Sequence, residues 1–161
     1  MVVGGFDELF ADQQERLLRL CWLLTLDEQV AAEVAQETLA RAWRDWPELN
    51  SPGFDANAWL RRVAVNLCWD RSRRRAARKR RAHLVVSPRV SADALADVDL
   101  HRAIARLSDR QRQVVVLRYW DDLDLAGCAD AMSVSVGSVK QHLARAHAGL
   151  ARAPELAKDD R

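Results

Sequence analysis

The stretch LDLAGCADAMSVSVGSVKQHLARA, residues 123–146, decides the fold of the C-terminal part of this chain. It predicts a short helix, a polar turn and a second helix, because apolar residues recur at helical spacing on both sides of a serine-containing turn. Ser135 is expected to cap the second helix, since its hydroxyl can accept a hydrogen bond from a free backbone N–H. A helix-turn-helix of this kind can place its second helix in the major groove of DNA, whereas a solvated αα-corner is the plainer alternative.

The second helix of this stretch is expected to have two different sides. Its apolar residues recur at i, i+4, i+7 and i+11 and predict a buried side. Polar side chains occupy the other side and its flank, and such side chains can contact base edges or phosphates. The candidate DNA-binding residues are Ser138, Lys140, Gln141, His142 and Arg145.

The composition favours an all-α protein. The 161 residues are 49% hydrophobic and 30% charged, with six Gly and four Pro, and contain no alternating β-branched runs between turn signals. This length suits one ordinary domain or two small helical ones. No stretch reaches the ~20 apolar residues of a membrane span, and the start MVVGGFDELF lacks a basic segment followed by an apolar core. We therefore expect a cytoplasmic protein without membrane insertion.

The net charge of +2 is unevenly distributed. Residues 1–60 hold 4 Lys/Arg and 11 Asp/Glu, which gives −7, whereas residues 61–83 hold 10 Lys/Arg and one acid, which gives +9. Residues 84–161 hold 11 of each and are neutral. A basic block after an acidic region predicts a polyanionic partner at one place and a different partner elsewhere.

Two helices are predicted before the first loop. Residues 6–26 carry apolar residues mostly three and four apart, and residues 27–46 form a second helix that Asp27 can cap and Pro47 ends. The second helix also has a polar face, and for an isolated helix the plain interpretation is that this face is simply exposed to solvent. That face holds Glu33, Gln36, Glu37 and Arg41.

The apolar side of this second helix ends in two tryptophans, Trp43 and Trp46, of which one is expected to be buried. The following loop, residues 48–58, contains the turn sequence NSPG, and Asp55 or Asn57 can cap the next helix.

The helix that begins near Trp59 is strongly basic. Its residues 71–81 read RSRRRAARKRR, and so many like charges at helical spacing repel one another unless a polyanion such as a nucleic-acid backbone neutralises them. One face combines Arg62, Asn66, Trp69 and Arg73. Trp69 can stack an unpaired base or pack against a neighbouring helix, and the sequence leaves both open.

A change of composition after this helix predicts a linker near residues 84–95, with Pro88 and few periodic apolar residues. Helical periodicity resumes at Val98. Ser108 and Gln111 have the spacing of a capping box, so a further helix is expected to start at Asp109.

Three cysteines, Cys21, Cys68 and Cys128, lie far apart within apolar helical patterns and form no CxxC pair. Buried structural thiols are the favoured interpretation, and a metal or redox site is the weaker one. The sequence shows no metal-ligand spacing, phosphate loop or carboxylate pair for an enzyme or metal sensor. We expect no catalysis, metal, cofactor or small-molecule substrate.

Three blocks together resemble bacterial RNA polymerase sigma factors of the extracytoplasmic-function (ECF) group, over about residues 6–150. The first is AEVAQETLARAW, residues 32–43, which is similar to the family's A-E-D-L-V-Q-E-T-F-x-R-A-W. The second is WLRRVAVNLCWDRSRRR, residues 59–75, similar to W-L-x-R-I-A-x-N-x-x-x-D-x-x-R-R. The third is LSDRQRQVVVLRYWDDLDLAGCADAMSVSVGSVKQHLARA, residues 107–146, similar to L-P-x-R-Q-R-x-V-x-x-L-R-Y-x-E-x-L-S-x-x-E-I-A-x-x-L-G-x-S-x-G-T-V-K-S-R-L-x-R-A.

The resemblance implies two small helical domains, residues 1–83 and 96–153, joined by the linker at residues 84–95. Residues Glu33, Gln36, Glu37 and Arg41 would bind the clamp helices of the largest polymerase subunit. The loop at residues 50–57 would help to read and melt the −10 element together with Arg62, Asn66, Trp69, Arg73 and Arg74. The five polar residues of the helix-turn-helix would read the −35 element. The implied partners are core RNA polymerase and promoter DNA, with an anti-sigma factor as a further candidate.

The chain departs from the family pattern at three positions. Ala32 replaces the first acid of its block, Gly127 replaces a glutamate of the first helix-turn-helix helix, and Ser133 stands where the family has a turn glycine. A stand-alone helix-turn-helix repressor or activator is the alternative function. It would explain residues 108–150 but would leave the acidic region and the basic helix without a role.

Overall fold

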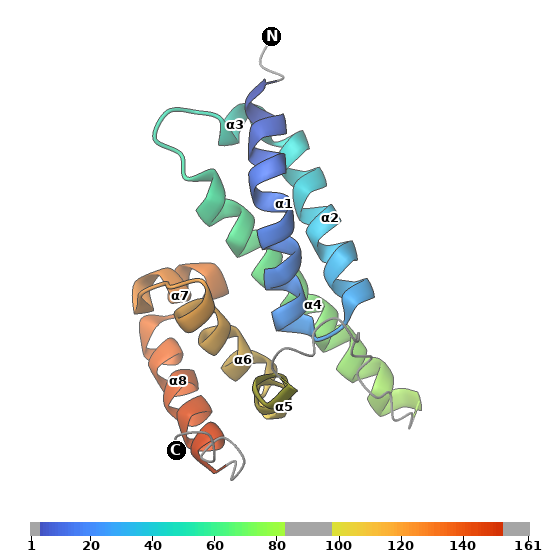
Figure 1. Ribbon diagram of the computed structural model, residues 1–161, viewed down its shortest axis with the longest axis vertical. Helices are drawn as coiled ribbons and strands as arrows, with labels where there is room; N and C mark the ends of the chain where they lie inside the picture. The colour runs from blue at the N-terminus through green and yellow to red at the C-terminus, as the bar shows by residue number, and fades with distance from the viewer. Residues whose placement is uncertain (1–3, 83–97, 153–161) are drawn as a thin grey trace. The chain divides into compact units, whose positions relative to one another are not determined.

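The computed structural model describes residues 4–82 and 98–152 (Figure 1), and every regular element in these ranges is helical. The chain divides into two compact units, Met1–Arg89 and Val90–Arg161. The all-α prediction is confirmed. The predicted linker, residues 84–95, lies outside the residues that the structure describes.

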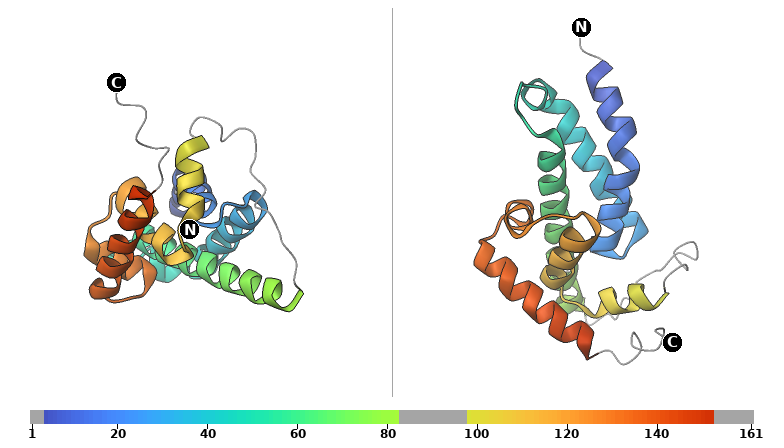
Figure 2. Two further views of the ribbon diagram at one scale, coloured as in Figure 1. Left: turned by 90° about the horizontal axis from the view of Figure 1, so that it is seen from below. Right: turned by 60° about the vertical axis from the view of Figure 1, so that its left-hand side comes forward.

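The first unit is built from three long helices that lie side by side (Figures 1 and 2): α1 (Gly4–Thr25), α2 (Glu28–Arg44) and α4 (Ala56–Ala82). α1 and α2 are antiparallel, because only two residues separate them. Each helix turns one apolar stripe inward, as the periodicity predicts. The core contains Leu17, Cys21, Val34, Leu60 and Ala64, all buried.

The turn between α1 and α2 is fixed by two adjacent residues. Leu26 has a φ of 53° and buries its side chain, and its backbone N–H donates to the carbonyl of Trp22 across 2.8 Å. Asp27 then caps α2 by accepting a hydrogen bond from the backbone N–H of Val30 across 3.1 Å. The predicted cap is confirmed.

The end of α2 differs from the prediction. The helix stops at Arg44, and Pro47 lies in the first turn of the short α3 (Trp46–Leu49), where a proline is well tolerated because that N–H needs no helical partner. Part of the expected loop is therefore helical. Asp55 caps α4 through the N–H of Ala58 at 2.9 Å.

The second unit contains α5 (Val98–Arg106), α6 (Asp109–Val115), the π-helical segment η2 (Val116–Trp120), α7 (Leu125–Met132) and α8 (Val136–Ala151). Its core holds Leu117, Met132, Val139 and Ala146, all fully buried. The Ser108–Gln111 capping box is present in both directions and starts α6 at Asp109, as predicted.

The turn between α7 and α8 contains a residue in the left-handed conformation, and this residue is a serine rather than a glycine. Ser133 has a φ of 54° and a ψ of 46° at the end of α7. Ser135 caps α8 as predicted, accepting from the N–H of Ser138 across 3.1 Å. Asp124 caps α7 through the N–H of Gly127 across 2.6 Å. Both helices of the helix-turn-helix are thus capped despite the departures at residues 127 and 133.

Candidate functional site

The outer side of α8 carries most of the candidate DNA-binding residues in the positions that the sequence predicts. Lys140, Gln141 and Arg145 are exposed, and Ser138 and His142 are half-buried. The hydroxyl of Ser138 lies 3.0 Å from that of Ser135, so Ser138 takes part in the cap of its own helix. The exposed side chains can hydrogen-bond a ligand in a groove.

His142 lies in a partly buried and positively charged environment. Burial is the main cause that lowers the pKa of His142, and the charges of Arg110 and Arg145 add to it. The neutral imidazole is therefore favoured at neutral pH. In that form His142 offers one donor and one acceptor rather than two donors.

A second candidate surface lies along α4. Arg62, Asn66, Trp69 and Arg73 follow one another at spacings of four, three and four, which places them on one face of the helix. The guanidinium of Arg73 lies 6.0 Å from the ring centroid of Trp69, within the range of a cation–π contact. Arg74 is exposed on the next position around the helix. The face combines cationic groups with a half-buried aromatic ring, which is the chemistry that single-stranded nucleic acid requires.

The polar face of α2 is less free than the sequence suggests. Arg41 donates to Glu37 across 2.5 Å, and Arg71 of α4 contacts both Glu33 and Glu37. The hydrogen bond from Arg41 is the largest cause that lowers the pKa of Glu37, partly opposed by burial and supported by Arg71. Gln36 is exposed on the same helix.

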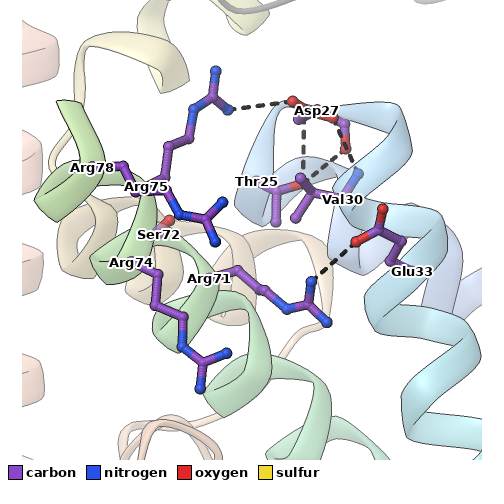
Figure 3. A pocket seen from close by; sticks show the side chains of 9 residues that line it. All are labelled: Thr25, Asp27, Val30, Glu33, Arg71, Ser72, Arg74, Arg75 and Arg78. Atoms are coloured by element: carbon purple, nitrogen blue, oxygen red, sulfur yellow. Dashed lines mark hydrogen bonds and ion pairs between the residues drawn. The ribbon is translucent and has the colours of Figure 1, made fainter. Parts of the chain in front are cut away.

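Two arginines of the basic helix have a role that the sequence interpretation did not assign to them. Arg71 and Arg75 line a cavity of about 340 Å³ between α4 and the start of α2, where Arg75 bonds Asp27 across 3.3 Å (Figure 3). A signal was available: these two arginines continue the stripe of Ala64 and Cys68, which faces the neighbouring helices.

An apolar groove of about 560 Å³, which the sequence did not predict, lies between α1 and α2. Two large apolar side chains in it are exposed: Leu18 by 42% and Trp43 by 57%. The ring of Trp43 lies edge-on to Phe6, with 4.9 Å between centroids. Gln36 lines the same groove, so the groove adjoins the candidate polar face of α2.

The cysteines are buried free thiols, as predicted. The neighbouring Cys21 thiol and burial raise the pKa of Cys68 well above its usual range, which leaves it protonated. Within residues 4–82 and 98–152, no three His, Cys, Asp or Glu side chains gather in a metal-binding group. In the same ranges no helix has the length and hydropathy needed to span a membrane.

Comparison with known proteins identifies both units. The family model Sigma-70 region 2 matches residues 9–78, and Sigma-70, region 4 matches residues 97–148. The ECF RNA polymerase sigma factor SigM of Mycobacterium tuberculosis is 35% identical, over 92% of this chain and 76% of the relative. The RNA polymerase sigma-E factor of Streptomyces antibioticus is 32% identical, over 90% of this chain and 82% of the relative.

A solved structure has a similar fold. The sigma factor RpoE of Bartonella quintana, crystallised with the anti-sigma factor NepR, gives a TM-score of 0.79 at 23% identity and covers 99% of this chain and 100% of its own. The two regions, their order and the identity over nearly the whole length together assign the family. This chain belongs to the ECF group of RNA polymerase sigma factors.

Proposed function

We propose that this sigma factor binds core RNA polymerase with its first unit and reads the −10 and −35 promoter elements with α4 and α8. As a member of its family, the chain directs promoter-specific transcription by RNA polymerase. One observation carries the −35 assignments: α8 exposes Gln141 and Arg145 on the side opposite its buried Val139, and Lys140 at the flank of that side. We propose that the protein acts in the cytoplasm, as a regulatory rather than a catalytic protein.

For the −35 element, we assign base contacts to Gln141 and Arg145. Their exposed amide and guanidinium groups match the donor and acceptor pattern of base edges in the major groove. His142 lies beside them on a partly buried flank of α8 and can add a contact. We assign Lys140 to phosphate, since it lies at the flank, and Ser138 to a smaller role because its hydroxyl serves the helix cap.

For the −10 element, we propose that Trp69 and Asn66 hold unpaired bases of the melted strand. The guanidinium of Arg73 beside the Trp69 ring extends a flat cationic surface on which a base can stack. We assign Arg62 and Arg74 to the phosphate backbone. Phe54, which is 44% exposed in the loop before α4, belongs to the same proposed surface, since the resemblance places residues 50–57 there.

For core polymerase, we propose a surface centred on Gln36, which extends into the apolar groove beside it. Exposed tryptophans that fill a partner's pocket commonly dominate interface energies, and Trp43 has the required exposure. Glu33, Glu37 and Arg41 supply a charged rim along the same helix. This assignment adds an apolar component to the surface that the sequence predicts.

The alternative of a stand-alone repressor or activator is not favoured. Such a protein has no need for region 2, and that region accounts for residues 9–78 of this chain. An anti-sigma factor is a further proposed partner, as NepR is for RpoE. No cofactor is proposed.

Strand opening tests the assignment most specifically. The Asn66→Ala and Trp69→Ala variants are expected to bind core polymerase normally but to leave promoter thymines unreactive to permanganate. Trp43→Ala and Leu18→Ala should instead weaken core binding while DNA contacts stay intact. Normal opening by both α4 variants would contradict the role of this face.

A further inference from the structure

Arg71 contacts α2, although it belongs to the basic helix α4. Its Nη1 donates to Oε2 of Glu33 across 3.0 Å, and its Nη2 donates to Oε2 of Glu37 across 3.1 Å. Figure 3 shows the first of these contacts. One guanidinium therefore bridges two carboxylates that stand one helical turn apart.

Both carboxylates are also held along α2 by their other oxygen. Oε1 of Glu33 accepts from the side-chain amide of Gln29 across 3.3 Å, and Oε1 of Glu37 accepts from Arg41 across 2.5 Å. Two carboxylates at i, i+4 repel each other, and the guanidinium between them removes this repulsion. The four contacts give each side chain one preferred orientation.

The bridge leaves its members accessible. The side chains of Arg71 and Glu37 are each 35% exposed, and that of Glu33 is 45% exposed. Ion pairs with this exposure contribute little to folding stability, because water and salt screen them. They remain open to a partner that approaches α2 from outside, so a role in binding is better supported than a role in folding.

The position of Arg71 on α4 separates it from the proposed DNA face. It follows Cys68 by three residues and Ala64 by seven, and both of these are buried. Arg71 therefore lies on the side of α4 that faces α2, and not on the face that carries Asn66, Trp69 and Arg73. The assignment of the basic block to DNA does not account for this arginine.

We propose that Arg71 is a positioning residue for polymerase binding, which holds Glu33 and Glu37 in the orientation in which α2 meets core polymerase. This inference rests on the proposed function of the α2 face. A side chain that is already ordered loses less conformational freedom on binding, so the bridge lowers the entropic cost of forming the complex. Arg71 itself need not touch polymerase.

The test measures the Kd of the full-length chain for core polymerase. Arg71→Met is expected to raise Kd about fivefold, because two glutamates must then be ordered during binding. Arg71→Lys should fall between Arg71→Met and wild type, since an ammonium keeps the charge but not the fork that spans two carboxylates. Arg75→Met is the matched control: it removes the same charge one turn along α4 and breaks an ion pair with Asp27, not with the glutamates. It should leave Kd within about twofold of wild type.

A double-mutant cycle separates positioning from a general structural effect. In a Glu33→Gln, Glu37→Gln background, Arg71→Met should no longer change Kd, because there are no carboxylates left to orient. Wild-type or tighter binding by Arg71→Met would overturn the proposal. Equal losses of affinity in Arg71→Met and Arg75→Met would also overturn it, as would a loss of affinity on Arg71→Met that persists in the glutamine background. If the glutamate variants lose affinity but Arg71→Met does not, only the positioning role fails. If the glutamate variants bind as wild type, the proposed role of the α2 face fails with it.

Discussion

Arg112 donates a hydrogen bond from Nε to the backbone carbonyl oxygen of Ile104 across 3.2 Å, and this bond joins α6 to the end of α5. A second nitrogen, Nη2, donates to the carbonyl of Leu107 across 3.1 Å. The guanidinium is buried, and burial is the main cause that lowers its pKa, against the favourable charge of Asp109. Arg112 therefore adds charged donors to two carbonyls at the end of α5, of which that of Ile104 also accepts from the backbone N–H of Leu107 across 3.1 Å.

Replacing Arg112 should destabilise the second unit. We expect Arg112→Met to lower its free energy of unfolding by about 2 kcal/mol, because two buried carbonyls lose charge-assisted hydrogen bonds. Amide hydrogen exchange in α6 and α8 measures this unit separately from the first. Arg106→Met is the control, since Arg106 is exposed on α5, and its effect should stay within about 0.5 kcal/mol. Equal effects of both variants would contradict the role of the buried contacts.

Ser133 and Ser135, the two serines of the turn between α7 and α8, should respond in opposite directions when replaced. Ser133→Gly is expected to stabilise the second unit by about 0.5–1 kcal/mol, because a left-handed backbone strains any residue with a Cβ. Ser135→Ala should destabilise it by about 1 kcal/mol through loss of the α8 cap. Chemical denaturation followed by circular dichroism checks both. A loss of stability in Ser133→Gly would show that its side chain matters more than its backbone strain.

The caps illustrate what the sequence could predict. Asp27, Ser108 and Ser135 each serve a helix start within three residues, so the local pattern was sufficient to identify them. The helix-turn-helix and its exposed polar side follow in the same way from periodicity.

Ion pairs between residues far apart in the sequence could not be predicted from the sequence. Arg71 meets Glu33 from 38 residues away, and Arg75 meets Asp27 from 48 residues away, so their pairing depends on how α4 packs against α2. The run RSRRRAARKRR hid this division because its arginines carry the same charge whichever way they face. The short α3 was not predicted either, because Pro47 can stop a helix or begin one. In the structure Pro47 lies in the first turn of α3, and Trp46 packs against Phe6 with 5.5 Å between ring centroids.

His142 should make the second unit sensitive to pH. Its pKa in the folded chain lies below the ~6.5 of an unfolded chain, so the unfolded state takes up the proton first as the pH falls. Stability from this residue is therefore complete above about pH 7 and decreases as the pH falls through the folded pKa. The free energy of unfolding measured from pH 7.5 to 5 should fall less steeply in His142→Gln than in wild type. Identical slopes would remove His142 as the cause.

The outer side of α8 should separate base contacts from phosphate contacts. Arg145→Ala and Gln141→Ala are expected to reduce discrimination at −35 positions, since each good base contact contributes about 1–3 kcal/mol of discrimination. Lys140→Ala should weaken binding by a similar factor on all sequences and flatten its salt dependence. Holoenzyme binding to a set of promoters with single −35 substitutions measures both effects. Unchanged selectivity and affinity in all three variants would exclude α8 as the reading helix.

Dependence on core polymerase tests the central claim most directly. The measurement is promoter binding and run-off transcription by the chain alone, by core polymerase alone and by the two together. We expect weak binding by the free chain and a discrete run-off transcript only from the combination, because polymerase sets the spacing of two reading surfaces that lie on separate units. Arg41→Glu, which places a third carboxylate beside Glu33 and Glu37, should abolish both the transcript and co-purification with core while the helical circular dichroism signal stays intact. The claim would be contradicted if the free chain bound the promoter tightly, the combination gave no transcript and Arg41→Glu behaved as wild type.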